Sequence, residues 1–141
     1  MKPVKNEPVE SKSVPTTSTE ASVKKFRLNF NKQHYTLDGE PAMELRPGYK
    51  GTYAEIKDSD YLPSTLNRIL GRALANSSED FGGKEFEWYP VLYNSGVLEL
   101  DSTDARRLKD FITSKRKGEG AFSNLIVKAL FDVFKAANFT E

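Results

Sequence analysis

The sequence contains no cysteine and only one histidine, His34, among its 141 residues. Without cysteine the chain cannot form a disulfide, a thiolate metal site or a cysteine nucleophile. One histidine also leaves too few nitrogen ligands for an ordinary zinc site. A single histidine beside a predicted turn is more typical of a surface residue than of a general base. We therefore expect no bound metal.

Long apolar runs are also absent, since no stretch approaches the roughly 20 residues that a membrane-spanning helix requires. Lys2 and Lys5 near the start are not followed by the apolar block of a secretory signal. We expect a soluble, cytoplasmic protein with no membrane partner. The net charge is only +1, from 21 basic and 20 acidic side chains. Any binding to a polyanion must then come from a local patch rather than from the whole surface.

Sequence signatures of enzymes are missing as well. Neither a glycine-rich phosphate loop nor a G-x-S-x-G nucleophile motif occurs. Two acidic pairs, Asp58 with Asp60 and Asp101 with Asp104, precede predicted helices, where the helix dipole favours negative charge. We predict no catalytic residue and no cofactor. An enzyme whose site is built on these four carboxylates remains the alternative.

Composition divides the chain into two parts. Residues 1–23 hold three of the seven prolines and a Ser/Thr cluster but no aromatic residue, so they cannot bury enough apolar surface to order themselves. We predict a disordered tail over residues 1–23 and a single domain over residues 24–141.

The first half of this domain has the pattern of short strands. Phe26, Leu28 and Phe30 alternate with polar residues, which predicts a half-buried strand. Asp38-Gly39 predicts a tight hairpin turn, because this pair tolerates the positive φ values that such a turn needs. The segment TYAEI, residues 52–56, predicts a further strand.

The remaining pattern predicts three helices and a second hairpin. Apolar residues recur at helical spacing over residues 61–75, 102–117 and 121–137. Residues 84–100 predict a hairpin, because Phe86 and Trp88 share one side of a first arm and Asn94-Ser95-Gly96 turns the chain. Pro90 interrupts this arm, which indicates an edge strand or a bulge. The predicted fold class is α+β, with a mostly antiparallel sheet of two hairpin-like units packed with three helices.

One segment resembles a known family. Residues 44–69, ELRPGYKGTYAEIKDSDYLPSTLNRI, are similar to the strand, turn, strand and helix ending of transcriptional coactivator domains of the positive cofactor four type. The resemblance implies binding to single-stranded DNA as a dimer, through a curved sheet. It covers 26 of the 141 residues, and the second half of the chain has no counterpart in that family.

Two sets of side chains are candidates for binding a protein partner. Tyrosine, tryptophan and arginine are the residue types that most often dominate the binding energy of an interface. Basic residues gathered on the second predicted helix can meet an acidic surface, although they also complement the helix dipole. The candidates are Trp88, Tyr89, Tyr93, Phe131, Arg106, Arg107, Lys109, Lys115, Arg116 and Lys117.

A second hypothesis concerns nucleic acid. Cations at the start of the first strand, together with nearby tyrosines, could form a sheet face on which bases stack while the cations meet phosphates. The residues are Lys24, Lys25, Arg27, Tyr35 and Tyr53.

The sequence therefore favours a non-enzymatic regulatory protein that binds a larger protein or macromolecular machine, in the manner of an accessory factor of a phage or mobile element. A single-stranded nucleic-acid-binding protein is the alternative. The sequence does not determine the oligomeric state.

Overall fold

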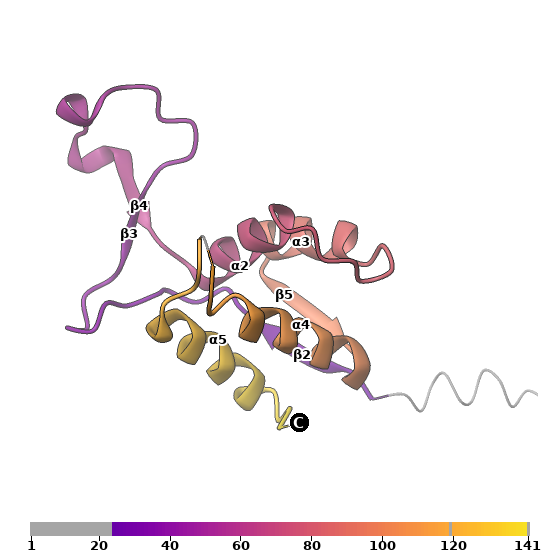
Figure 1. Ribbon diagram of the computed structural model, residues 1–141. Coiled ribbons are helices and arrows are strands. Elements are labelled where there is room, and N and C mark those ends of the chain that lie inside the picture. The colour runs from indigo at the N-terminus through magenta and orange to yellow at the C-terminus, as the bar shows by residue number, and fades with distance from the viewer. Residues whose placement is uncertain (1–23, 119, 141) are drawn as a thin grey trace, which may run out of the picture.

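The computed structural model describes residues 24–118 and 120–140, so the predicted tail at 1–23 lies outside the described residues. Within this part the chain forms four α-helices, two antiparallel pairs of strands and two short 3-10 helices (Figure 1). The α+β class is confirmed. In chain order the elements are β2 (Phe26–Asn29), β3 (Met43–Leu45), η1 (Tyr53–Glu55), η2 (Asp58–Asp60), β4 (Tyr61–Pro63), α2 (Leu66–Ala75), α3 (Glu85–Asn94), β5 (Val97–Leu100), α4 (Ser102–Ser114) and α5 (Asn124–Ala136).

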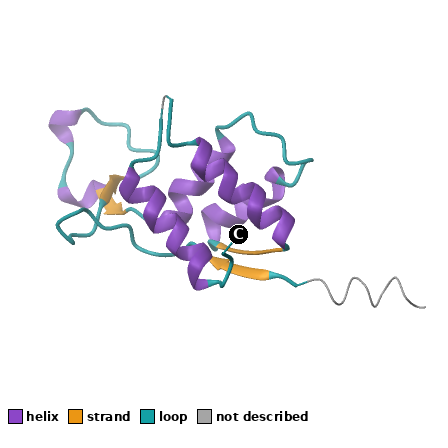
Figure 2. Cartoon of the chain, turned by 60° about the horizontal axis from the view of Figure 1, so that its bottom comes forward, coloured by secondary structure: helices purple, strands orange, loops and turns teal. Residues whose placement is uncertain are grey.

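The core forms where the helices pack against the β2–β5 pair (Figure 2). Phe26, Leu28 and Phe30 point inward from β2 and the residue after it, as their alternation predicted. Leu98 and Leu100 do the same from β5. All four helices contribute side chains to this one cluster, and Phe139 closes it with its ring centroid 5.0 Å from that of Phe26.

β2 does not pair with the chain that follows it. Its partner is β5, in the register Phe26↔Leu100 to Asn29↔Val97. The predicted first hairpin therefore does not include β2, although its Asp38-Gly39 turn is present. A pairing between segments so far apart in sequence depends on the whole fold, which local turn signals do not report.

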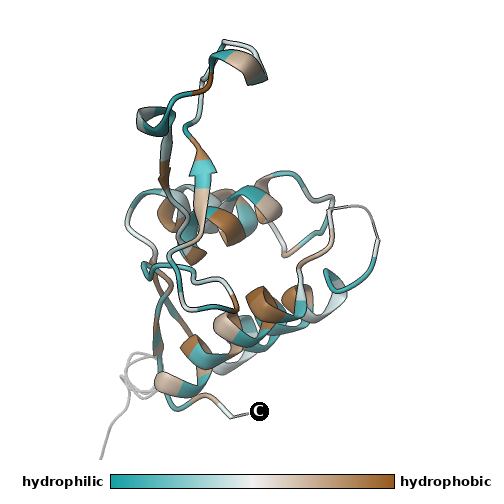
Figure 3. Ribbon diagram, turned by 90° about the vertical axis from the view of Figure 1, so that its left-hand side faces the viewer, coloured by the Kyte–Doolittle hydropathy of each residue, from teal (hydrophilic) through white to brown (hydrophobic). Residues whose placement is uncertain are grey.

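β3 and β4 form a second antiparallel ribbon that projects from the body, with residues 46–60 as its tip (Figure 3). We call residues 33–65 the arm. The predicted turn at Asp38-Gly39 is present at its root, where the Gly39 amide donates to the Thr36 carbonyl and Tyr35 bridges Pro41. The strand predicted at residues 52–56 is wrong, since this segment contains the 3-10 helix η1.

The predicted first arm of the second hairpin is also wrong, because Glu85–Asn94 is helix α3. Pro90 lies inside α3 on its exposed side, where the missing backbone hydrogen bond faces solvent. Glu85 and Glu87 stand in the first turn, where negative charge favours the helix. The described part of the chain thus has four helices rather than the predicted three.

The other helices were predicted with longer bounds. The helix predicted from residue 61 begins at Leu66, because Tyr61–Pro63 pairs with β3. α4 is capped by Asp101, whose Oδ1 accepts from the Asp104 amide at 2.9 Å. α5 is capped by Ser123, which accepts from the Ile126 amide. Among the described residues, no helix combines the length and the apolar character needed to span a bilayer.

Candidate functional site

Helix α3 carries apolar side chains on both of its sides. Trp88 and Leu92 face the core and are buried. The opposite side carries four further ring residues at the spacing i, i+3, i+4 and i+7, which places them in one row along a helix. We call this row the α3 stripe, made of Phe86, Tyr89, Pro90 and Tyr93.

The α3 stripe is open to solvent at its N-terminal end. Phe86 is 67% exposed and Pro90 is also exposed. Tyr89 and Tyr93 are half-buried. The rings of Phe86 and Tyr89 meet edge to face with centroids 6.4 Å apart. The half-buried tyrosines have less side-chain freedom left to lose on binding than the exposed Phe86 has.

A hollow of about 430 Å³ lies beside the α3 stripe, between α2 and α3. Gly71 on α2 lines this hollow and lets the two helices approach closely, because a β-carbon there would lie 3.2 Å from the Tyr93 nitrogen and 3.3 Å from the Tyr89 oxygen. Another backbone therefore packs close to Gly71. The other lining residues are Arg72, Ala75, Asn76, Tyr89, Pro90, Tyr93 and Asn94.

Acidic side chains lie on α3 and in the loop before it. Glu87 lies exposed on α3 next to the stripe, and Glu79 and Asp80 lie exposed in the loop before α3. Glu85 is half-buried, and its Oε1 accepts from the amides of Phe81 and Gly83, each at 3.1 Å. A partner that covers the stripe is therefore best matched by an apolar segment with basic neighbours.

Arg72 is the cation at the edge of the hollow. Its guanidinium is held mainly by Glu44, which raises its pKa, and a hydrogen bond with Tyr93 acts in the same direction. Because Glu44 engages both terminal nitrogens at 3.1 and 3.0 Å, Arg72 is a fixed wall of the hollow.

The other predicted aromatic contacts lie elsewhere. Trp88 is only 4% exposed and packs in the core, with its ring centroid 5.4 Å from that of Phe81. The structure therefore places Trp88 away from the surface. Phe131 is half-buried on α5, and Lys109 lies over its ring at 5.3 Å and over Phe139 at 5.9 Å.

The predicted basic residues lie on α4 and the turn after it, not on α3. Arg106 pairs with Asp110 at 3.6 Å. Lys115 is half-buried, and its carbonyl accepts from the Phe122 amide. Arg116 approaches the Asn124 side chain at 3.5 Å, and Lys117 is exposed just beyond it.

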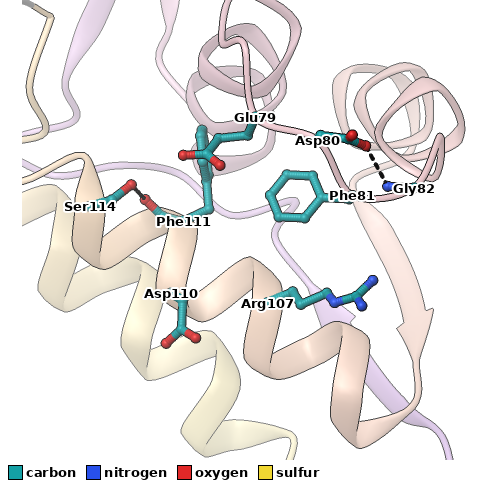
Figure 4. A pocket seen from close by; sticks show the side chains of 8 residues that line it. All are labelled: Glu79, Asp80, Phe81, Gly82, Arg107, Asp110, Phe111 and Ser114. Atoms are coloured by element: carbon teal, nitrogen blue, oxygen red, sulfur yellow. Dashed lines mark hydrogen bonds between the residues drawn. The ribbon is translucent and has the colours of Figure 1, made fainter.

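Arg107 borders a separate hollow of about 550 Å³ (Figure 4). Glu79, Asp80 and Asp110 line the same hollow, and Arg107 also lies 3.8 Å from Asp104. Acidic neighbours thus accompany this cation on several sides, so the α4 region is a mixed surface rather than a continuous positive patch.

The residues predicted for nucleic acid are not gathered on one sheet face. Arg27 pairs across the strands with Glu99 at 4.0 Å, and Lys24 lies over the Phe26 ring at 5.0 Å. Lys25 is exposed before β2. Tyr35 and Tyr53 lie on the arm instead, at its root and tip respectively.

The two acidic pairs have structural partners. Asp101 caps α4, and Asp104 accepts from Lys84 at 2.7 Å. The Lys57 amide and the Arg46 side chain both donate to Asp60 and lower its pKa. Within residues 24–118 and 120–140, no three histidine or carboxylate side chains lie close enough to hold a metal ion.

Comparisons with known proteins give no match: none of the family models, the curated proteins or the solved structures is similar to this chain. The resemblance of residues 44–69 to coactivator domains gains no support from them.

Sequence reasoning named Tyr89 and Tyr93 but missed Phe86 and Pro90. Under the strand interpretation, Phe86 and Trp88 shared one side. The signal that identifies the stripe is the helical spacing of Phe86, Tyr89, Pro90 and Tyr93, which Pro90 itself obscured because proline argues against a helix interior.

Proposed function

We propose that this protein is a non-enzymatic regulator that acts by binding a larger protein through the α3 stripe. The observation that carries this proposal is the row Phe86, Tyr89, Pro90 and Tyr93 beside the α2–α3 hollow, in which Phe86 and Pro90 are exposed and the two tyrosines are half-buried. Side chains at i, i+3, i+4 and i+7 are the anchors by which helices dock against apolar grooves and other helices.

The energetics favour this surface over others in the body. The helix fixes the positions of these rings, and aromatic residues contribute much of the binding energy of interfaces. Glu87 beside the stripe favours a partner segment whose apolar row has lysine or arginine at its border.

A cross-linking experiment tests the proposal. A photoreactive phenylalanine analogue at position 86 should capture one defined partner in the native cell, whereas the same analogue at the partly exposed Leu125 on α5 should not. In an affinity pull-down, the tagged wild-type protein should retain the same partner, and Phe86→Asp and Tyr93→Asp should each abolish this capture. Two results would contradict the proposal: the same cross-linked partner from positions 86 and 125, or a partner that is still captured by both the Phe86→Asp and the Tyr93→Asp variants.

Regulation needs its own measurement. Once the partner is captured, its activity should change on addition of wild-type protein and stay unchanged with Phe86→Asp. A salt titration with an oligonucleotide separates the nucleic-acid alternative, because phosphate contacts weaken steeply as salt rises. The alternative would be favoured if the protein binds the oligonucleotide at low salt, if Lys25→Gln and Arg27→Gln abolish this binding, and if Phe86→Asp leaves it intact.

A further inference from the structure

The arm has one face composed only of apolar side chains. Residues directly opposite each other in an antiparallel pair share a face, and every second residue along a strand returns to it. Met43 pairs with Pro63, and Leu45 pairs with Tyr61. The bridge between Tyr35 and Pro41 extends this face toward the root. We call it the arm face: Tyr35, Pro41, Met43, Leu45, Tyr61 and Pro63.

The arm face is open to solvent in the monomer. Tyr35 and Met43 are each 52% exposed and Tyr61 is 41% exposed. The ribbon stands away from the helices, so a second molecule can approach it without meeting the body (Figure 3). A contiguous apolar patch of this kind usually marks an interaction surface.

The opposite face of the ribbon is already occupied. It carries Glu44 and Leu62, and Glu44 forms ion pairs with Arg68 at 3.4 Å and with Arg72 at 3.0 Å. These contacts fasten the ribbon to α2. The arm therefore has one free face, and its orientation relative to the body is fixed.

Charge indicates what covers this face. None of its six side chains is charged, and at its tip end Arg46 and Asp60 neutralise each other at 3.2 Å. A second copy of the chain, related by a two-fold axis, would thus bring apolar against apolar with no like charges opposed. A polyanion would meet no cation on the face. The α3 stripe differs, because Glu87 beside it would face another Glu87 near a two-fold axis.

We infer that two copies of this chain associate through their arm faces to form a symmetric dimer. A ribbon of two strands is marginal by itself in water and needs packing on a face. α2 supplies that packing on one face, and the second copy supplies it on the other. This inference is independent of the partner proposed for the α3 stripe.

Sedimentation equilibrium of the full chain tests the inference. The mass should approach twice that of the monomer and should fall toward the monomer on dilution. Met43→Asp and Tyr61→Asp should each weaken association by at least about tenfold, since a buried unpaired charge costs more than about 1.4 kcal/mol. The matched control is Phe86→Asp, an aspartate at an exposed aromatic outside the arm face, which should leave the dimer unchanged.

A monomer at all concentrations, or equal loss of association for all three aspartates, would overturn the inference. Circular dichroism shows whether each variant remains folded. If Phe86→Asp abolishes partner capture while the dimer persists, the two surfaces are separated. If Met43→Asp or Tyr61→Asp abolishes the dimer while partner capture persists, the arm face and the α3 stripe are again shown to act separately.

Cross-linking provides a second measurement that needs no charged substitution. Because the chain has no cysteine, a single introduced thiol has no other thiol within its own chain. Met43→Cys and Tyr61→Cys should form disulfide-linked dimers on mild oxidation at least about tenfold faster than Phe86→Cys, because a dimer raises the effective concentration of the two thiols. Equal rates at the three positions would contradict an arm-face dimer.

Discussion

Arg72 on α2 and Glu44 on β3 form a two-point ion pair, with Nη1 3.1 Å from Oε2 and Nη2 3.0 Å from Oε1. Arg68 adds a third contact to the same carboxylate at 3.4 Å. The Glu44 side chain is 16% exposed, so this pairing lies partly out of water. It joins the arm to the helix that also forms one wall of the α2–α3 hollow, and thereby links both candidate surfaces to α2.

The first prediction concerns this link. Glu44→Gln should destabilise the protein by about 1 kcal/mol, a value reduced for the partial exposure of Arg72, because the two guanidinium groups lose their counter-charge. Urea unfolding measures the change. Glu40→Gln, at an exposed position near the arm root, is the control and should change the stability by less than about 0.5 kcal/mol. Equal effects of the two substitutions would show that the ion pair does not hold the arm.

The second prediction is the pH dependence of the same pair. Burial raises the pKa of Glu44, but the hydrogen bond and charge of Arg72 outweigh it, so the pKa lies below its ordinary value of 4.5. A lowered folded pKa stabilises the fold above the ordinary value, and this contribution disappears as the pH falls through the folded pKa. The stability difference between wild type and Glu44→Gln should therefore stay constant near neutral pH and shrink below about pH 4.5. A difference that grows on acidification would contradict it.

The third prediction concerns His34 at the arm root. Burial lowers the pKa of His34 below its ordinary value of 6.5, so the folded state favours the neutral ring. The resulting stability is present above about pH 6.5 and is lost as the pH falls below it. As the only histidine, it should give a decline in unfolding free energy that begins as the pH falls below about 6.5 and that His34→Gln removes. Parallel pH profiles for the two proteins would refute this assignment.

The fourth prediction compares two glycines that both have positive φ. Gly39 has φ of 86°, and a β-carbon added there would meet open space. At Gly96, with φ of 80°, that atom would lie 2.8 Å from Asn67 Cβ and 3.0 Å from the Asn31 nitrogen. Gly39→Ala should cost about 1–2 kcal/mol for left-handed strain alone. Gly96→Ala should cost about 1–3 kcal/mol more for the clash. Chemical unfolding of both variants checks the difference, and equal costs would exclude the clash.

Local patterns predicted the elements whose burial is periodic. The alternation Phe26, Leu28, Phe30 identified β2, and the apolar spacing that begins at Leu66 identified the body of α2. The partner of β2 could not be predicted in this way. The register Phe26↔Leu100 joins strands about 70 residues apart that also pack against α3, α4 and α5, and no short window contains that information.

The candidate surfaces were predicted only in part for the same reason. Tyr89 and Tyr93 were identified by residue type, but a strand places Phe86 beside Trp88 and a helix separates them by about 200°. The arm face required the pairing of Met43 with Pro63 and of Leu45 with Tyr61. The two paired strands are joined by the arm tip. The sequence predicted a strand there, whereas the structure has two 3-10 helices.

The last prediction tests the two sides of α3 directly. Trp88 is 4% exposed in the core and Phe86 is 67% exposed, although only one residue lies between them. Trp88→Ala should destabilise the protein by about 3–5 kcal/mol, because it leaves a cavity next to Phe81. Phe86→Ala removes an exposed ring, so it should change stability by less than about 0.5 kcal/mol while it lowers partner capture. Thermal unfolding of the two variants checks this, and comparable losses of stability would mean that α3 does not present Phe86 to solvent.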